Sequence, residues 1–156
     1  MKLNIGISEK NLKNTAALLA TVLAGEMTLY TKTRKAHWNV TGESFMELHK
    51  LYENHYKQLE EAIDEIAERI GKLGQKTIGT MAEFLQLSRI KEHPGKYGST
   101  KDTIKELLTD HETVIVQLRK DVDDCVKNKD AGTADFLTGL MEKHETIAWI
   151  LRRYLN

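Results

Sequence analysis

The sequence predicts an all-α protein, a bundle of four long helices with a short extra helix in the connection between the second and the third. Two observations support this prediction. Only one proline occurs among the 156 residues, and apolar residues recur at steps of three and four over long stretches instead of alternating, which is the period of a helix. A chain of this length fits a single domain, which we expect to span residues 1–156.

Two long apolar stripes occupy the first half of the chain. Ser8 is a suitable N-cap for a first helix that runs to about Trp38. A Thr-Gly pair then interrupts the pattern, and a second helix of roughly eight turns begins near Phe45. We expect Gly71 and Gly74 to close this helix.

The second half begins with a long connection over residues 75–99, in which Thr80 can cap a short helix over residues 81–87. A third helix follows this connection, and a fourth runs from Thr133 to the end of the chain. A connection of this length usually spans a bundle. One long crossover between the second and third helices is the topology of a ferritin-like bundle, which is therefore the predicted fold.

Composition narrows the classes of function. The 23 basic and 23 acidic residues cancel, which removes the broad positive field that non-specific nucleic-acid binding needs. The single cysteine, Cys125, excludes an intrachain disulfide framework and suits a reducing compartment. No stretch resembles a signal peptide or a membrane span. We expect a soluble cytoplasmic protein.

Charged residues of the second helix form a face of their own beside the apolar stripe. At 100° per residue, His49, Glu53, Asp64 and Glu68 share this face. The simplest interpretation is a solvated charged surface, because such helix faces are common. Their spacing suggests another interpretation, a metal site shared by two chains. His49 and Asp64 are about 22 Å apart along a helix, so one metal ion cannot contact both in the same chain.

Two copies of the second helix would bring these residues together. If the helices pair antiparallel about a two-fold axis near residues 58–59, His49 lies opposite Glu68 of the partner subunit and Glu53 lies opposite Asp64 of the partner subunit. This self-complementarity is what an isologous dimer interface requires. Buried carboxylates at this density need cations. The mixture of imidazole and carboxylate suits ferrous iron, manganese or zinc.

A longer motif carries a family resemblance. Residues 35–48, KAHWNVTGESFMEL, are followed by His49, Glu53 and the segment DEIAERI at residues 64–70. This combination resembles the signature of the Dps family of mini-ferritins, and helix by helix the resemblance covers nearly the whole chain. Many members carry aspartate at the position of Glu53. The extra methylene here leaves direct and water-mediated metal contact both open.

The resemblance implies a dodecameric shell with a ferroxidase site at each two-fold interface. It implies that His37, His49 and Glu53 of one subunit and Asp64 and Glu68 of the other are the ligands. Each site would take iron, with two ions possible, and oxidise Fe(II) with hydrogen peroxide or oxygen. The shell would then store the ferric mineral, which would protect the cell against oxidative damage.

The resemblance also assigns roles outside the ligand set. Trp38 would lie close enough to the iron to meet oxidising intermediates; the alternative is an aromatic packing anchor at the end of the first helix. Acidic pores at three-fold axes would admit iron, and Asp124, Asp130 and Asp135 occupy suitable positions near the last turn. The alternative for these three is an ordinary role at solvated turn and helix-end positions.

We assign the remaining candidates to packing or to no site. The apolar stripes contain two histidines, which we interpret as hydrogen-bonded core residues, and they contain a cysteine, which we interpret as a small core hydrophobe. Two further histidines lack carboxylates at ligand spacing, and the second tryptophan is interpreted as packing. No glutamate is followed by histidine three positions later, which disfavours an intra-subunit di-iron centre of the ordinary ferritin kind. The two core histidines are His111 and His144, and the cysteine is Cys125. The two further histidines are His55 and His93, and the second tryptophan is Trp149.

We therefore predict an enzyme, a ferroxidase that stores iron. The alternative is a DNA-binding nucleoid protein whose iron chemistry is secondary, and a plain helical scaffold is a third possibility. The segment before Ser8 contains only Lys2 as a basic side chain. With a net charge of zero, we predict weak or absent DNA binding at physiological salt. A scaffold would leave the self-complementary ligand set unexplained.

Overall fold

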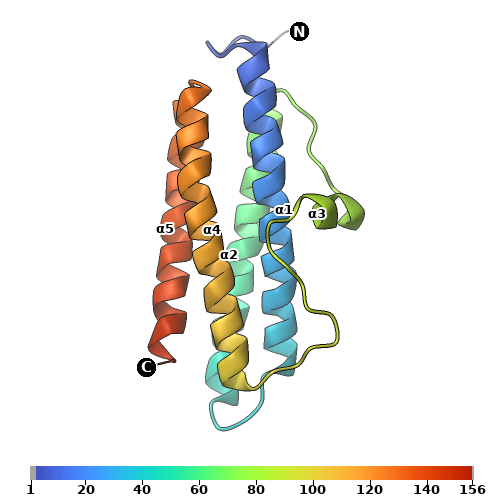
Figure 1. Cartoon of the computed structure of the whole chain (residues 1–156), viewed down its shortest axis with the longest axis vertical. Coiled ribbons are helices and arrows are strands. Elements are labelled where there is room, and N and C mark those ends of the chain that lie inside the picture. Colours follow the sequence, from blue (N-terminus) through green and yellow to red (C-terminus); the bar gives the residue numbers. More distant parts are fainter. Residues whose placement is uncertain (1–2, 156) are drawn as a thin grey trace.

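The computed structural model describes residues 3–155, which form five helices and no strand. The helices are α1 (Glu9–Asn39), α2 (Phe45–Lys72), α3 (Met81–Leu87), α4 (Thr100–Lys127) and α5 (Ala131–Arg153). The four long helices stand side by side, and the connection that contains α3 returns along the length of the bundle outside α1 (Figure 1). The crossover makes α2 and α4 run in the same direction. The predicted all-α, ferritin-like bundle with its short extra helix is confirmed.

Local capping chemistry explains where three of the helices begin. The Ser8 hydroxyl accepts a hydrogen bond from the Asn11 backbone N–H at 3.2 Å. Thr80 and Ser99 each form a capping box, in which the side chain three residues later accepts from the cap's own backbone N–H. These caps satisfy N–H groups that have no partner inside the helix. All three starts agree with the sequence prediction.

The start of α5 differs from the prediction by two residues. The prediction places the start at Thr133, but the helix begins at Ala131 because Asp130 is its N-cap and accepts from the Thr133 backbone N–H at 2.9 Å. The end of α2 agrees with the prediction at Gly74, whereas Gly71 lies inside the last turn of the helix, which ends at Lys72. Gly74 has a φ of 73°, and this left-handed conformation ends α2 at low steric cost.

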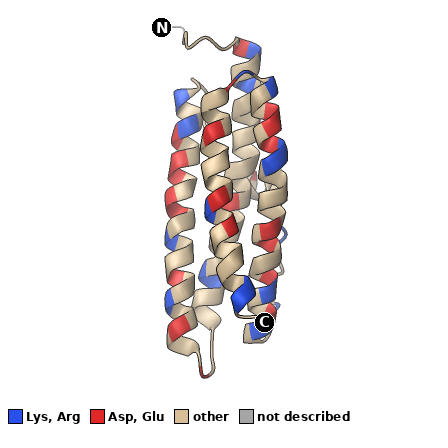
Figure 2. Cartoon of the chain, turned by 90° about the vertical axis from the view of Figure 1, so that its left-hand side faces the viewer, with Lys and Arg blue, Asp and Glu red and all other residues tan. Residues whose placement is uncertain are grey.

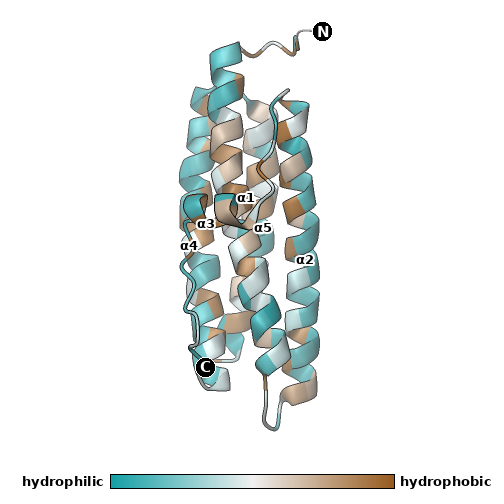
Figure 3. Cartoon of the chain, turned by 90° about the vertical axis from the view of Figure 1, so that its right-hand side faces the viewer, coloured by the Kyte–Doolittle hydropathy of each residue, from teal (hydrophilic) through white to brown (hydrophobic). Residues whose placement is uncertain are grey.

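The core lies between the four long helices. Leu19, Leu23, Tyr52, Ile66 and Leu118 are among the fully buried side chains, and each buried leucine or isoleucine stabilises the fold by about 1.5–3 kcal/mol. Hydrophilic residues make up much of the outer faces of the helices (Figure 3). Charged residues of both signs are interspersed along them (Figure 2). No helix within residues 3–155 is long and apolar enough to cross a membrane.

Two packing predictions have opposite outcomes. Cys125 is completely buried, and burial raises the pKa of its thiol to about 12, which confirms a core role. Trp149 is 54% exposed, so the packing role predicted for it is not fulfilled in the core of this chain. The neighbouring Ile147 and Ala148 are buried, and the next position on the helix points outward.

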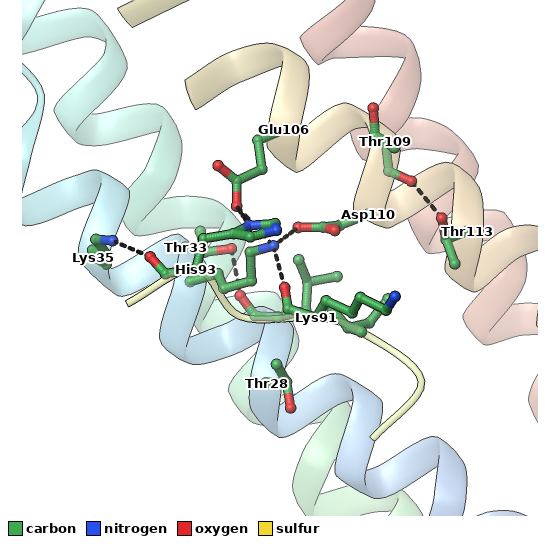
Figure 4. A network of polar contacts seen from close by, with 12 residues as sticks. Thr28, Thr33, Lys35, Lys91, His93, Glu106, Thr109, Asp110 and Thr113 are labelled. Carbon is green, nitrogen blue, oxygen red and sulfur yellow. Dashed lines mark hydrogen bonds and ion pairs between the residues drawn. The ribbon is translucent and has the colours of Figure 1, made fainter. Parts of the chain in front are cut away.

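A polar clamp fixes the crossover against α1 and α4 (Figure 4). The Lys32 ammonium lies 2.6 Å from the Asp110 carboxylate and 2.9 Å from Glu106, and it donates to the Lys91 carbonyl oxygen at 2.9 Å. His93 of the crossover contacts Glu106 at 3.1 Å. Only 9% of the Lys32 side chain is exposed, which strengthens these charged contacts. The crossover and α3 therefore lie on α1, and they leave the charged face of α2 uncovered.

Candidate metal centre

His37 and His49 form a stacked pair where α1 ends and α2 begins. Their ring centroids are 3.7 Å apart, with planes 21° from parallel. His37 Nδ1 lies 2.8 Å from the His49 carbonyl oxygen, and His49 Nδ1 lies 3.0 Å from the His37 carbonyl oxygen. A carbonyl oxygen only accepts, so both Nδ1 atoms carry hydrogen. Each neutral ring then has its lone pair on Nε2, the atom available to a metal ion.

These reciprocal hydrogen bonds orient the two rings in the way that hydrogen-bond acceptors commonly orient histidines that bind a metal ion. A histidine ligand usually donates its other ring N–H to an oxygen, which fixes the tautomer and the ring orientation. Two aromatic rings pack against the pair. The Phe45 and His49 ring centroids are 5.1 Å apart, and the Tyr56 and His37 ring centroids are 5.3 Å apart with planes 79° from parallel. The short turn between α1 and α2 therefore presents two oriented imidazoles at one end of the bundle.

Glu53 lies one helical turn beyond His49 on the same face of α2. Its Oε1 is 2.6 Å from the Lys57 ammonium, and that hydrogen bond is the main cause that lowers the Glu53 pKa. Positive charge on His37 or His49 would lower the same pKa further. At neutral pH the chain therefore places one ionised carboxylate within electrostatic range of the two imidazoles.

Asp64 and Glu68 lie near the other end of α2, and both are exposed. Glu68 has a weak ion pair with Lys72 at 3.4 Å. Across the described part of a single chain, no three His, Cys, Asp or Glu side chains lie close enough together to hold a metal ion. The five predicted ligands are therefore placed as two separate half-sites, one with His37, His49 and Glu53 and the other with the two carboxylates. Their union in one site needs a second chain and stays a prediction.

Trp38 is next to the histidine pair but is not packed into the core. It is 64% exposed, and the Arg34 guanidinium lies 5.2 Å from its ring centroid. Trp38 is therefore not a packing anchor within this chain. The ring is on the surface beside His37, where it is accessible to a reactive species or to a partner chain.

The three predicted pore residues are in different environments. Asp130 is 1% exposed, caps α5 and pairs with Arg69 at 3.1 Å, which is a structural role. Asp124 is exposed and pairs with Lys127 at 2.7 Å, and Asp135 is exposed on the first turns of α5. An iron-entry pore formed by these residues needs neighbouring subunits and stays a prediction.

Sequence reasoning missed a polar cluster in the bundle centre. The predicted hydrogen-bonded core histidines are confirmed, since His111 Nδ1 and His144 Nδ1 are 2.8 Å apart. Glu26 was not singled out, yet it is 1% exposed and lies 3.0 Å from His144 Nε2. His55 is equally buried. The available signal was a glutamate inside the apolar stripe of the first helix, where a charged residue needs a partner.

Comparison with known proteins identifies the family. A family model described as a ferritin-like domain matches residues 16–156. The DNA protection during starvation protein 2 of Bacillus anthracis is 37% identical over 145 residues, which are 92% of this chain and 98% of that protein. This chain belongs to the Dps family of ferritin-like proteins. A low temperature-induced protein of Nostoc is 46% identical over 156 residues, which cover 99% of this chain and 87% of that protein.

Solved Dps structures have the same fold. The Dps protein of Vibrio cholerae, described as a member of a broad superfamily of ferritin-like diiron-carboxylate proteins, superposes with a TM-score of 0.92 at 28% identity and covers 100% of this chain and 98% of that chain. Dps from Bacillus brevis superposes with a TM-score of 0.90 at 29% identity over the full length of both chains. The family resemblance predicted from residues 35–70 is confirmed.

Proposed function

We propose that this Dps-family protein is a ferroxidase that takes Fe(II) as substrate at sites shared by two chains and stores the ferric product in a shell. The observation that supports it most directly is the histidine pair. Reciprocal bonds to backbone carbonyls fix both Nδ1 atoms as donors and leave two Nε2 lone pairs beside the Glu53 carboxylate. The other half-site, Asp64 and Glu68, supplies the hard oxygen ligands that Fe(III) favours.

The proposed reaction oxidises two Fe(II) ions by one electron each and reduces one hydrogen peroxide molecule by two electrons. With two water molecules, the products are two FeOOH units and four protons. Carboxylates stabilise Fe(III) more than Fe(II) because its charge is higher. The protein's contribution is therefore to hold the ions next to ionised carboxylates. Pairing the electrons in this way avoids free hydroxyl radicals.

A two-fold assembly is part of the proposal. The uncovered charged face of α2 and the separation of the two half-sites both support a second copy of the chain as the missing part. Relatives in the same family carry names that refer to DNA protection during starvation. We propose that protection here is chemical, through removal of iron and peroxide in a dodecameric shell.

The decisive experiment is anaerobic titration of the purified protein with Fe(II), followed by peroxide, with ferric absorbance as the readout. We expect the His37→Ala, Asp64→Ala double variant to bind fewer ions per chain and to oxidise iron at least tenfold more slowly. Glu92→Ala is the matched control, since it removes an exposed carboxylate from the crossover, away from α2. Equal iron binding by the wild type and the double variant would exclude this site.

Direct DNA binding is the second candidate, favoured by the names of the relatives. The charge pattern argues against it, because basic and acidic residues are interspersed on the surface (Figure 2) and the net charge is zero. A gel shift at physiological salt should show no stable complex. A complex that survives 200 mM salt would indicate a local phosphate-binding surface and would require a revision of the proposal.

A further inference from the structure

A second group of metal-ligand residues lies in the centre of the bundle, one from each long helix. The group consists of Glu26 on α1, His55 on α2, His111 on α4 and His144 on α5, and each is only 1% exposed. None of the four belongs to the predicted interface site. Four polar side chains of this kind converge here on one level of an otherwise apolar core.

Hydrogen bonds inside this central cluster satisfy only part of it. His144 Nε2 lies 3.0 Å from Glu26 Oε1, and His144 Nδ1 lies 2.8 Å from His111 Nδ1. The second Glu26 oxygen, Oε2, has no hydrogen-bond partner within the described residues, and both ring nitrogens of His55 also have none. Buried polar atoms almost always have partners. The orphaned atoms therefore indicate that a further group belongs in the cluster.

Electrostatics favour neutral imidazoles. Burial lowers the pKa of His55 to about 4. Burial lowers the pKa of His111 well below its ordinary value, and positive charge on His144 or His55 would lower it further. Neutral imidazole is the form that binds a transition metal, because it offers a lone pair.

We propose that His55, His111 and His144 bind a single divalent transition-metal ion of the zinc class inside each chain. Glu26 would hold His144 through Nε2, the usual arrangement of a carboxylate behind a histidine ligand. Three imidazoles with a nearby carboxylate suit Zn²⁺ and Co²⁺ better than a hard cation such as Mg²⁺. The ion would also supply the partner that His55 lacks.

The spacing of the rings fits such an ion after a small movement. Tetrahedral coordination at about 2.0–2.1 Å separates two ligand nitrogens by about 3.3 Å and their ring centroids by about 5 Å. The His111 and His144 centroids are 5.0 Å apart, but their Nδ1 atoms, at 2.8 Å, must separate by about half an ångström. The His55 ring, 6.5 Å from His111, must move inward. Before this movement, no three of the described ligand side chains lie close enough to hold a metal ion. In this proposal the His55 ring therefore completes the site only when the ion binds.

This central site is independent of the proposed iron oxidation. All of its ligands come from one chain, whereas the interface site needs two. An ion bound by residues of α2, α4 and α5 would link three of the four long helices. Because such an ion binds the folded chain only, the unfolding temperature should rise with the logarithm of the free ion concentration once that concentration exceeds the dissociation constant.

The test uses the assembled His37→Ala, Asp64→Ala protein, in which the interface site is removed. Titration with Co²⁺, followed by visible absorption, should reveal one equivalent per chain with the intense bands of tetrahedral coordination. Zinc should raise the unfolding temperature of the same protein. Adding His55→Leu should weaken Co²⁺ binding at least tenfold and abolish the zinc effect. His93→Leu, which removes an exposed crossover histidine, is the matched control and should change neither.

Three results would overturn the proposal: no bound Co²⁺ in the background protein, full retention of Co²⁺ after His55→Leu, or a crystal soaked in zinc that shows only a buried water beside His55. The crystal, with anomalous scattering at the zinc edge, decides the question even if the His55→Leu protein does not fold. The leucine should be tolerated, because His55 loses no hydrogen bond. Loss of iron oxidation in the background protein alone would concern only the proposed ferroxidase function.

Discussion

The chain holds histidines in two contrasting ways. At the end of the bundle, His37 and His49 are half-buried, and backbone carbonyls fix their Nδ1 atoms. In the centre, His111 and His144 are fully buried and are bonded to each other. The first arrangement leaves the two Nε2 lone pairs available to a metal ion, and we propose that a partner subunit completes this site. The second is closed within one subunit, so we expect it to govern stability more than iron chemistry.

The largest expected effect concerns the shared nature of the first site. Subunits with His37→Ala and subunits with Asp64→Ala should each be inactive alone, because each removes a ligand from both sites of a dimer. The two variants are unfolded and refolded together in equal amounts, so that half of the dimers contain one subunit of each kind. In each mixed dimer one of the two sites has all its ligands. Iron oxidation should then recover to about a quarter of the wild-type rate.

Stopped-flow ferric absorbance on the mixed assembly measures this recovery, and Glu92→Ala subunits mixed with wild type serve as the control for refolding. If the mixed assembly oxidises iron no faster than the separate variants, the site is not shared between two chains. Either all five ligands of a site come from one chain, or these residues take no part in the reaction.

The central cluster should show the reverse pattern, a large effect on stability and a small effect on iron oxidation. Glu26→Ala leaves His144 without its carboxylate in a fully buried position. Leaving the buried His144 Nε2 without its hydrogen-bond partner costs about 1–3 kcal/mol. Urea unfolding monitored by circular dichroism measures the loss, and the double change of Glu26 and His144 to leucine should recover much of it. An unchanged midpoint in Glu26→Ala would show that the pair contributes nothing to the fold.

The sequence predicted the features that depend on neighbouring residues and missed those that depend on residues far apart in the chain. The caps Ser8, Thr80 and Ser99 were predictable because capping depends on residues within three positions. The start of α5 was not, since Asp130 and Thr133 both suit a cap by local sequence. In the structure Asp130 is the cap, and Arg69 of the distant α2 contacts both residues.

The site residues divide similarly. The short turn between α1 and α2 stacks His37 on His49, and Glu53 follows one helical turn later on the same face of α2. Glu26 was missed, since its partner His144 is more than a hundred residues away in sequence. Whether Asp64 and Glu68 join the first half-site depends on a second chain, which the fold of one chain does not determine.

Acid should destabilise the central cluster over a defined window. The His55 pKa is about 4 in the folded chain, against an ordinary value of 6.5. Between these values the unfolded state binds more protons, so stability falls as the pH drops from 6.5 to 4 and is fully present above 6.5. The loss from His55 alone is about 3 kcal/mol at most. Metal-free wild type and His55→Leu should be compared by urea unfolding at pH 7 and pH 4.5. The variant should lose less stability, and parallel losses would assign the acid effect to other groups.

The smallest expected effect is at Glu53, where the first half-site departs from the aspartate that is common in the family. Glu53→Asp shortens the side chain by one methylene and withdraws it from Lys57, with which it now pairs at 2.6 Å. Because Glu53 is at the surface, the unfolding midpoint should not change. Iron oxidation should change by less than about tenfold, because the histidine pair is untouched and water can bridge the gap.

Glu53→Ala, which removes the carboxylate, separates direct contact with the iron from an effect of charge alone. If aspartate and alanine lower the rate equally, Glu53 contacts the iron directly and its length is essential. If aspartate is active and alanine is not, the charge matters and the contact distance does not.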